Sequence, residues 1–354
     1  MTRAGKTLVW ATLLVAAAVV LVFLQAMYGP TRSFTADETW GAIAERFGVR
    51  GTDDAFVKTA VGLRMDRALT AAAVGASLAL AGALLQGLFR NALASPSLIG
   101  VTSGAGLGAV MAILALGSHG AGLTLMAGGA APYLVVGGAF VGALAVTTFV
   151  LVLATRGGAV SVPALLLIGV AVNACVGGML AAIQALVLPD YEVSRAILAW
   201  SFGSLDDRQP WQVGLSAVGL VVALAIVPWV AVELDLFAGG EEDAAALGVS
   251  TRRTKVLVVV AATAATACAT AVAGQIAFIG LVVPHLVRTL TGTSHRSLLW
   301  LAPPCGAVLL LGLDLAQLLL VGRRALPPGV VTALLGGPFF LFLLLRSRRG
   351  ALGW

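Results

Sequence analysis

Ten apolar stretches, each close to the length of a membrane-spanning helix, dominate this sequence and restrict what it can fold into. A helix needs about 20 apolar residues to cross the roughly 30 Å hydrocarbon core of a bilayer. Within that core every backbone polar group must be bonded inside the protein, which favours helices. The predicted spans are about 8–28, 67–88, 97–117, 131–154, 163–187, 211–232, 255–273, 277–291, 298–320 and 329–346.

The composition supports a membrane protein and argues against a soluble one. Of 354 residues, 59% are hydrophobic and only 11% are charged, whereas a soluble domain keeps roughly a quarter of its residues charged. The 43 glycines suit helices that pack closely in lipid, where small residues let backbones approach. The sequence therefore predicts an all-α, polytopic membrane protein with about ten transmembrane helices in a single domain, residues 1–354.

Basic residues between the spans predict which side faces the cytoplasm. With the N-terminus inside, the inner side carries twelve Lys and Arg residues, against four in the short outer loops. The longer outer segment from 29 to 67 adds six more to the outer side, which narrows the margin to twelve against ten. Because cytoplasmic loops carry an excess of Lys and Arg, we predict that both termini are cytoplasmic. Residues 188–211 mix charged and apolar side chains and predict an interfacial helix or a lid on the outer surface.

Motifs of common enzymes are missing. The sequence has no Walker A loop, no HExxH, no GxSxG and no cluster of Cys and His residues. We therefore expect no catalytic residue, no metal ligand and no cofactor on this chain.

Asp314 is the only carboxylate well inside a predicted span. A carboxylate at that depth is costly and is by default a functional candidate with a partner to be found. The alternative is an aspartate that ties two helices together by hydrogen bonds. We favour the tie, because proton relays usually contain more than one such group.

A short charged segment, LDLFAGGEEDAAALGVSTRRTK at 234–255, interrupts the apolar pattern between the sixth and seventh spans. Glu241 and Glu242 are typical of a helix N-terminus, and Gly248 is typical of the residue after a helix end. The predicted apolar stripe of this helix is Leu236, Ala244 and Leu247. Three acidic residues in a row disfavour an anionic membrane surface, so the stripe is predicted to bind a groove on a partner protein.

This segment resembles the cytoplasmic coupling segment of permeases in bacterial ABC importers for iron chelates, haem and vitamin B12. Four further stretches resemble the same family and occur in its order. They are LRMDRAL (63–69), GALLQGLFRNALASPSLIGVTSGAGLGA (82–109), GQIAFIGLVVPHLVRTLTGTSHR (274–296) and PPGVVTALLGGPFFLFLLLR (327–346). As a set they are highly specific, and they cover the chain from the second span to the tenth.

The resemblance implies the fold of a type II ABC importer permease, in the bacterial inner membrane. It implies three kinds of partner: a second permease copy or homologue, two ATPase subunits that bind ATP and Mg, and a periplasmic or lipid-anchored substrate-binding protein. The chain itself would not be an enzyme. The favoured cargo is a ferric siderophore, with haem and vitamin B12 as alternatives. An ion-driven secondary transporter is the alternative from another class.

The resemblance also implies roles at the two membrane surfaces. The ATPase-coupling segment, about 235–250, would act through Glu241, Glu242, Ala244, Leu247 and Gly248. At the outer mouth, Arg64 and Arg67 match an R-x-x-R pair with which relatives engage the binding protein; interfacial anchoring by long side chains is the alternative. Leu318 stands where the family has a third docking arginine, and Arg323 and Arg324 are candidate replacements.

The fifth span borders the central pathway in the family, which implies that Asn173 and Met179 line the translocation pathway. Helix packing through the neighbouring glycines and alanines is an equally good interpretation of any single position there.

Overall fold

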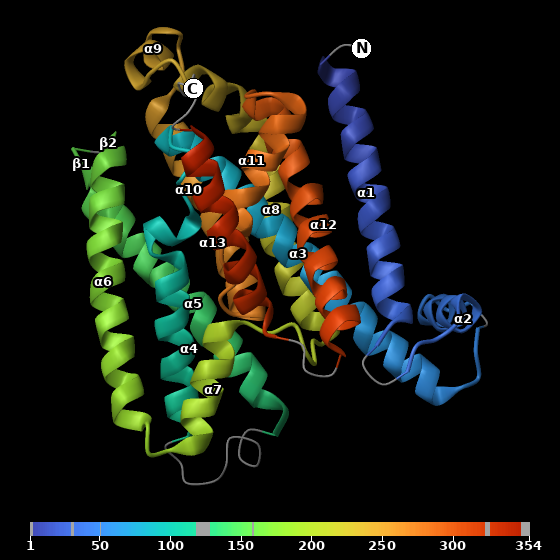
Figure 1. Ribbon diagram of the computed structural model, residues 1–354. Helices are drawn as coiled ribbons and strands as arrows, with labels where there is room; N and C mark the ends of the chain where they lie inside the picture. Colours follow the sequence, from blue (N-terminus) through green and yellow to red (C-terminus); the bar gives the residue numbers. More distant parts are fainter. Residues whose placement is uncertain are drawn as a thin grey trace.

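Helices make up nearly all of the described chain and pack into one bundle (Figure 1). The computed structural model describes residues 3–29, 32–49, 51–117, 128–157, 159–322 and 326–347. Within these ranges, seven helices are long and apolar enough to cross a membrane, and three shorter apolar helices accompany them.

The ten predicted spans are confirmed as helices. They correspond, in order, to α1 (Arg3–Met27), α3 (Ala55–Phe89), α4 (Val101–Gly117), α5 (Ala131–Ala154), α6 (Val162–Val187), α8 (Pro210–Phe237), α10 (Thr251–Ala273), α11 (Ile279–Thr291), α12 (His295–Val321) and α13 (Pro328–Ser347). The connections contain the short helices α2 (Ala36–Arg46), α7 (Tyr191–Phe202) and α9 (Glu241–Ala246), the 3₁₀ turns η1 (Pro96–Ile99) and η2 (Gly128–Ala130), and two antiparallel strands, β1 (Thr155–Arg156) and β2 (Ala159–Val160).

Several helices begin a few residues away from the predicted position, and the reason is clear for α3 and α4. α3 starts at Ala55 rather than near 67, because the Asp54 side chain accepts from the backbone N–H groups of Phe56 and Val57 and caps the helix. α4 starts at Val101 rather than near 97, because Pro96 opens a 3₁₀ turn that ends at Gly100, which has a φ of 82°. The hydropathy signal continues through both boundaries, so it could not locate them.

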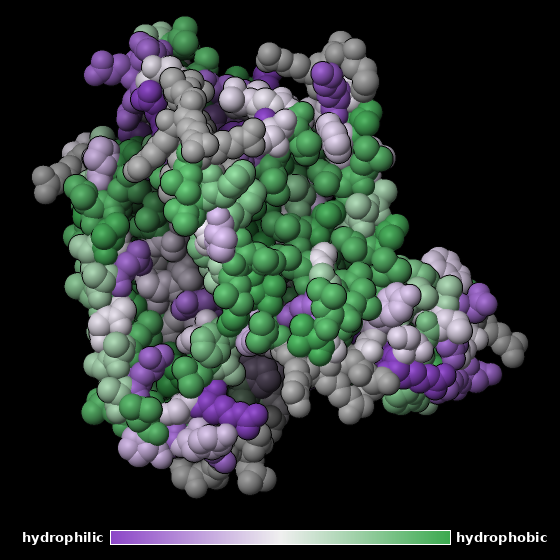
Figure 2. Space-filling model, viewed as in Figure 1, coloured by the Kyte–Doolittle hydropathy of each residue, from purple (hydrophilic) through white to green (hydrophobic). Residues whose placement is uncertain are grey.

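The two ends of the bundle differ. The start of α1, the end of α13 and α9 lie at one end, which we call the α9 end, whereas α2 and α7 lie toward the other, the α2 end (Figure 1). Hydrophobic side chains cover the middle of the molecule between hydrophilic groups at both ends (Figure 2). The predicted segment 188–211 contains the helix α7, whose Ile197 is buried while Leu198 is exposed, and its place on the outer surface stays a prediction.

The core centres on α3, which contacts α1, α8, α10, α11 and α12. Gly75 of α3 lies directly against the backbone of Gly306 in α12, where an added Cβ would collide with the Gly306 carbonyl. Such contacts gain dispersion energy that larger side chains would prevent. In contrast, the main neighbours of α6 in the described chain are α4, α5, α7 and η1, and its Leu167, Val170 and Leu186 are exposed.

Candidate functional site

The α9 helix forms much as its sequence predicts. Glu241 and Glu242 lie in its first turn, where acidic side chains interact favourably with the helix dipole. At its other end Gly248, with a φ of 88°, donates its N–H to the Ala245 carbonyl at 2.9 Å. The Val249 N–H reaches the Ala244 carbonyl at 3.0 Å, which completes a Schellman motif.

The predicted apolar stripe of this segment is wrong for Leu236. That residue belongs to α8, which runs on to Phe237, and the chain then breaks at Gly240, whose φ is 139°. Ala244 is fully buried against the bundle, whereas the Leu247 side chain is 69% exposed. Ala244 therefore packs α9 against the bundle, and Leu247 points away from it.

Lys255 holds α9 in place, a role that the sequence did not indicate. Its side chain is 5% exposed, and its ammonium group pairs with the Glu241 carboxylate. The same group donates to the backbone carbonyl of Val160 in β2 at 2.7 Å. A buried ammonium is stable only with such partners, so Lys255 joins α9, α10 and the strand pair that precedes α6.

Toward the α2 end, the structure brings two predicted residues together. Arg67 of α3 binds Asp314 of α12 through Nε–Oδ2 and Nη2–Oδ1 contacts, each 2.8 Å long. Gln25 of α1 donates to Asp314 at 3.3 Å and Gln317 does so at 3.0 Å. Arg67 also pairs with Asp206 in the α7–α8 connection. These contacts tie α12 to α3 and α1, which agrees with the interpretation that we favoured, and whether Asp314 also has a functional role stays untested.

Arg64 has different partners, although it lies one helical turn from Arg67. Its guanidinium donates to the carbonyl of Met27 at 2.9 Å and to that of Arg32 at 2.7 Å. It also lies 4.6 Å from the centre of the Phe34 ring, a cation–π contact. Arg64 therefore fastens the end of α1 and the start of the outer segment to α3.

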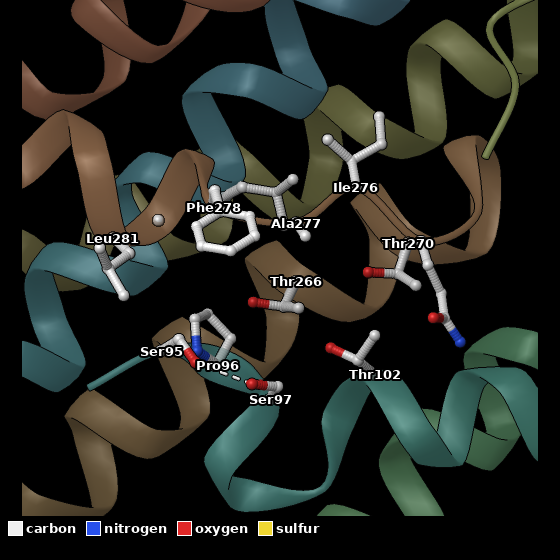
Figure 3. Close-up of a pocket in the computed structure, with 13 residues that line it drawn as sticks. Ser95, Pro96, Ser97, Thr102, Thr266, Thr270, Ile276, Ala277, Phe278 and Leu281 are labelled. Carbon is white, nitrogen blue, oxygen red and sulfur yellow. Dashed lines mark hydrogen bonds between the residues drawn. The ribbon is translucent and has the colours of Figure 1, made fainter. Parts of the chain in front are cut away.

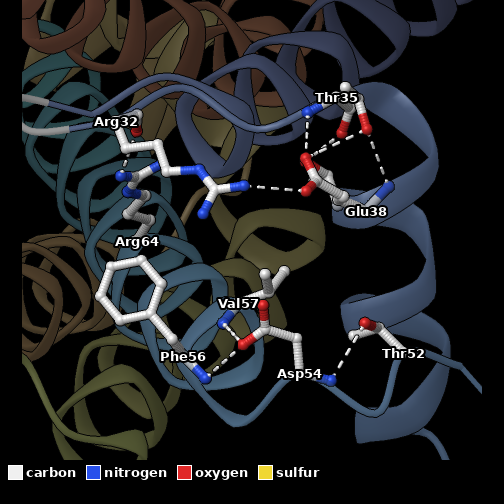
Figure 4. A network of polar contacts seen from close by, with 9 residues as sticks. Arg32, Thr35, Glu38, Thr52, Asp54, Phe56, Val57 and Arg64 are labelled. Atoms are coloured by element: carbon white, nitrogen blue, oxygen red, sulfur yellow. Dashed lines mark hydrogen bonds and ion pairs between the residues drawn. The ribbon is translucent and has the colours of Figure 1, made fainter.

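The segment around Arg64 and α2 has its own polar network (Figure 4). Glu38 accepts from the backbone N–H of Thr35 at 2.8 Å, which holds the pKa of that carboxyl below its usual value. Arg32 binds the same carboxylate at 3.1 Å. With Thr35 and Glu38 forming a capping box, α2 begins at a defined point beside α3.

The structure shows where the predicted docking and pathway residues lie, but it does not test their roles. The guanidinium groups of Arg64 and Arg67 both donate hydrogen bonds to partners within the protein, and they do not form one open basic face. Leu318 is partly buried in α12, and the candidate replacements Arg323 and Arg324 lie outside the described residues.

The two predicted pathway residues differ from each other. Met179 is 52% exposed on the open side of α6. The Asn173 side chain, in contrast, donates to the Ser97 carbonyl at 2.7 Å and accepts from the Ser103 hydroxyl at 2.6 Å. Asn173 therefore anchors η1 and the start of α4 to α6.

Comparisons with known proteins agree with this architecture. The model of the FecCD transport family matches residues 15–346. The hemin transport system permease protein HmuU of Yersinia pestis is 40% identical, over 84% of this chain and 86% of the relative. The cobalamin import system permease protein BtuC of Halobacterium salinarum is 39% identical, over 84% of this chain and 76% of the relative. The probable siderophore transport system permease protein YfhA of Bacillus subtilis is 36% identical, over 80% of this chain and 81% of the relative.

A solved structure shares the fold. It shows an inward-facing conformation of a metal-chelate type ABC transporter, with a TM-score of 0.79 and 27% identity, and the match covers 95% of this chain and 98% of that chain. The family match, the relatives and this fold all extend over most of the sequence, so this chain belongs to the FecCD transport family.

Proposed function

We propose that this chain is the membrane permease subunit of an ATP-driven importer and that its cargo is a ferric siderophore. Membership in a transport family and the likeness to a metal-chelate type ABC transporter support the first part. The named relatives serve hemin, cobalamin and siderophores at 40%, 39% and 36% identity. Haem and vitamin B12 therefore remain alternative cargoes that transport measurements must separate.

The observation that carries the proposal is the form of α9. It is a short acidic helix that seats Ala244 in the bundle, holds Glu241 against Lys255 and leaves Leu247 69% exposed. An exposed leucine on a rigid, acidic projection suits a groove on a protein partner better than an anionic lipid surface. Membership in a transport family and the likeness to an ABC transporter support a separate ATPase, which binds ATP and Mg, as the partner at this end.

The other partners follow from the same assignment. The α9 end and both chain termini face the cytoplasm of a bacterial inner membrane, so the α2 end faces a periplasmic or lipid-anchored binding protein. Arg64 and Arg67 lie toward that end and would meet acidic residues of the binding protein. The exposed face of α6, including Leu167 and Val170, meets a second permease copy or homologue, and the cargo passes beside Met179.

Reconstitution with a matching ATPase and binding protein tests this function directly. Proteoliposomes would be loaded with ATP on the α9 side and offered a radiolabelled ferric siderophore, haem or cobalamin on the α2 side. We expect ATP-dependent uptake of the siderophore, with hydrolysis stimulated by the loaded binding protein. Uptake that follows an ion gradient without ATP would instead support an ion-driven secondary transporter. Uptake of haem or cobalamin alone would reassign the cargo.

A further inference from the structure

A cavity of about 310 Å³ lies inside the bundle where two interruptions of helical backbone line the same space (Figure 3). One interruption contains Ser95 and η1, and the other is the segment Gly274–Phe278 between α10 and α11. Irregular backbone among membrane-spanning helices is tolerated where it is buried in protein or lines a water-filled space. The backbone N–H groups of Gln275, Ile276 and Ala277 have no backbone acceptor among the described residues, and all three residues line the cavity.

Two threonines of α10 add hydroxyl groups to the cavity. Thr266 is 1% exposed and Thr270 is 3% exposed, and Figure 3 shows both hydroxyls directed toward the space beside Phe278 and Ser97. A threonine inside a helix usually bonds back to the carbonyl four residues earlier, as Thr70 does to Asp66 at 2.8 Å. Within the described chain, the Thr266 hydroxyl is buried without a protein partner, and the Thr270 hydroxyl lies beside it at the edge of the same space (Figure 3).

The electrostatic surroundings favour negative charge. Thr102 in the first turn of α4 and Gly280 in the first turn of α11 both line the cavity. Unbonded N–H groups at a helix start carry positive partial charge. At the start of α11 the Ile279 and Leu281 N–H groups already bond to the Ala277 and Phe278 carbonyls, at 2.8 and 3.0 Å, so the start of α4 contributes more of this charge. The carbonyls at the end of α10 are better satisfied, since Thr270 and Ala273 accept from Gly274 and Ser204 at 2.8 Å each. None of the described lining residues is charged, so the two helix starts are not neutralised by a neighbouring carboxylate.

We propose that this cavity binds an anionic oxygen group, such as a carboxylate, on the periphery of the chelate as it passes through the membrane. Its volume of about 310 Å³ equals that of roughly ten water molecules, so it holds one side arm rather than a whole macrocycle. The wall that carries Ser97 is fixed to the pathway helix α6 through Asn173. This inference rests on the proposed function, because a passing chelate is what would bring such an arm to the site.

Charge-selective thiol reagents measure the local potential without knowledge of the cargo. Cys175, Cys268 and Cys305 would first be replaced by alanine, and Thr270→Cys introduced in the assembled transporter. The reagents are the sulfonatoethyl and trimethylammonioethyl methanethiosulfonates, with rates corrected for their reactivity toward a free thiol. We expect the anionic-to-cationic rate ratio to exceed that of Met179→Cys severalfold, because the start of α4 faces this site and no described lining residue carries a negative charge. A ratio equal to or below that of Met179→Cys overturns the proposal, as does a thiol unreachable with and without ATP.

Acetate provides the matching test of binding. Acetate should slow modification of Thr270→Cys severalfold, whereas acetamide, its neutral analogue, should not. Thr266→Val should abolish this protection, and Thr263→Val should preserve it. Thr263 is the matched control: it lies on the same helix and its hydroxyl is also buried without a partner, but it lines a different cavity beside Cys268.

The outcomes separate this site from the proposed function. Equal protection by acetate and acetamide, or none by either, overturns the binding site even if ATP-driven uptake is intact. Protection by acetate in a complex that shows no ATP-driven uptake overturns the proposed function alone. If Thr270→Cys fails to assemble with the ATPase, Thr102→Cys on the opposite wall of the cavity takes its place under the same criteria.

Discussion

Arg67 of α3 and Asp314 of α12 form a bidentate ion pair, with both N–O distances at 2.8 Å. The Asp314 side chain is only 3% exposed, and that of Arg67 is 24% exposed. The two helices already touch at Gly75 and Gly306, so the pair closes a second contact between them nearer the α2 end. Planar guanidinium and carboxylate groups match in this geometry, which fixes the rotation of one helix against the other.

Breaking this pair should destabilise the protein strongly. Removing one partner of a buried pair leaves the other charge uncompensated, at a cost of about 3–5 kcal/mol. We therefore expect Asp314→Ala to lower the thermal midpoint of the purified permease. The double variant Arg67→Met with Asp314→Leu should recover much of the loss, because it leaves no buried charge. Equal midpoints for Asp314→Ala and the native chain would contradict a structural role for this pair.

Leu247→Asp should uncouple ATP hydrolysis from uptake. The side chain is 69% exposed on α9, so the substitution places a charge in the partner's groove without disturbing the permease core. Uptake in proteoliposomes should fall at least tenfold, while the amount of folded permease stays unchanged. Leu247→Met keeps the apolar contact and is the control. Native uptake by Leu247→Asp with the ATPase still attached would show that α9 is not the coupling element.

Lys255→Met should also impair coupling, because it loosens the attachment of α9 and leaves the predicted contact of Leu247 with the partner unaltered. It removes the ammonium that joins Glu241 to the Val160 carbonyl, so α9 would no longer be fixed to the strand pair before α6. We expect a lower ratio of cargo transported to ATP hydrolysed, and partial recovery in Lys255→Arg. Glu241→Gln should produce a milder version of the same defect, since the Val160 bond remains. An unchanged ratio in Lys255→Met would assign this lysine a purely structural role.

Cysteines in α6 should report the pathway, and the two candidate positions should behave differently. In a background that lacks Cys175, Met179→Cys should react with aqueous thiol reagents in at least one nucleotide state, because that side chain is 52% exposed. Asn173→Cys should react and also lower uptake, since it removes the bonds to Ser97 and Ser103. If Met179→Cys is protected in every state, this face of α6 packs against the second permease copy instead.

Charge reversal at Arg64 and at Arg67 should have different effects on docking of the binding protein. Arg67→Glu would bring a third carboxylate beside Asp314 and Asp206, so we expect it to reduce permease abundance as well as binding. Arg64→Glu should weaken capture of the loaded binding protein mainly at low salt, where charge pairs are least screened. Arg64→Gln is the control, and the affinity of each permease for the loaded binding protein would be measured in nanodiscs at two ionic strengths. If the affinity for the binding protein does not depend on salt in the native permease, Arg64→Glu or Arg64→Gln, interfacial anchoring is the better interpretation of Arg64.

Much of this fold follows from local sequence. Each membrane-spanning helix satisfies its own backbone hydrogen bonds, so a run of apolar residues specifies it without reference to the rest of the chain. The ends of α9 were equally predictable, because the acidic first turn and the Gly248 stop act within a few residues of themselves. Local patterns also mark the family, since its motifs are contiguous stretches.

Tertiary structure alone decided which side chains meet. Arg67 and Asp314 lie 247 residues apart in sequence, and Lys255 and Val160 lie 95 apart. Such pairings depend on which helices become neighbours and how each is rotated, and hydropathy carries almost no information about either. The same is true of Thr266 and Thr270, which read as ordinary helix-packing residues until two distant breaks in helical backbone enclose the space in front of them. Helix formation is a short-range event, whereas a binding cavity exists only after remote segments have packed.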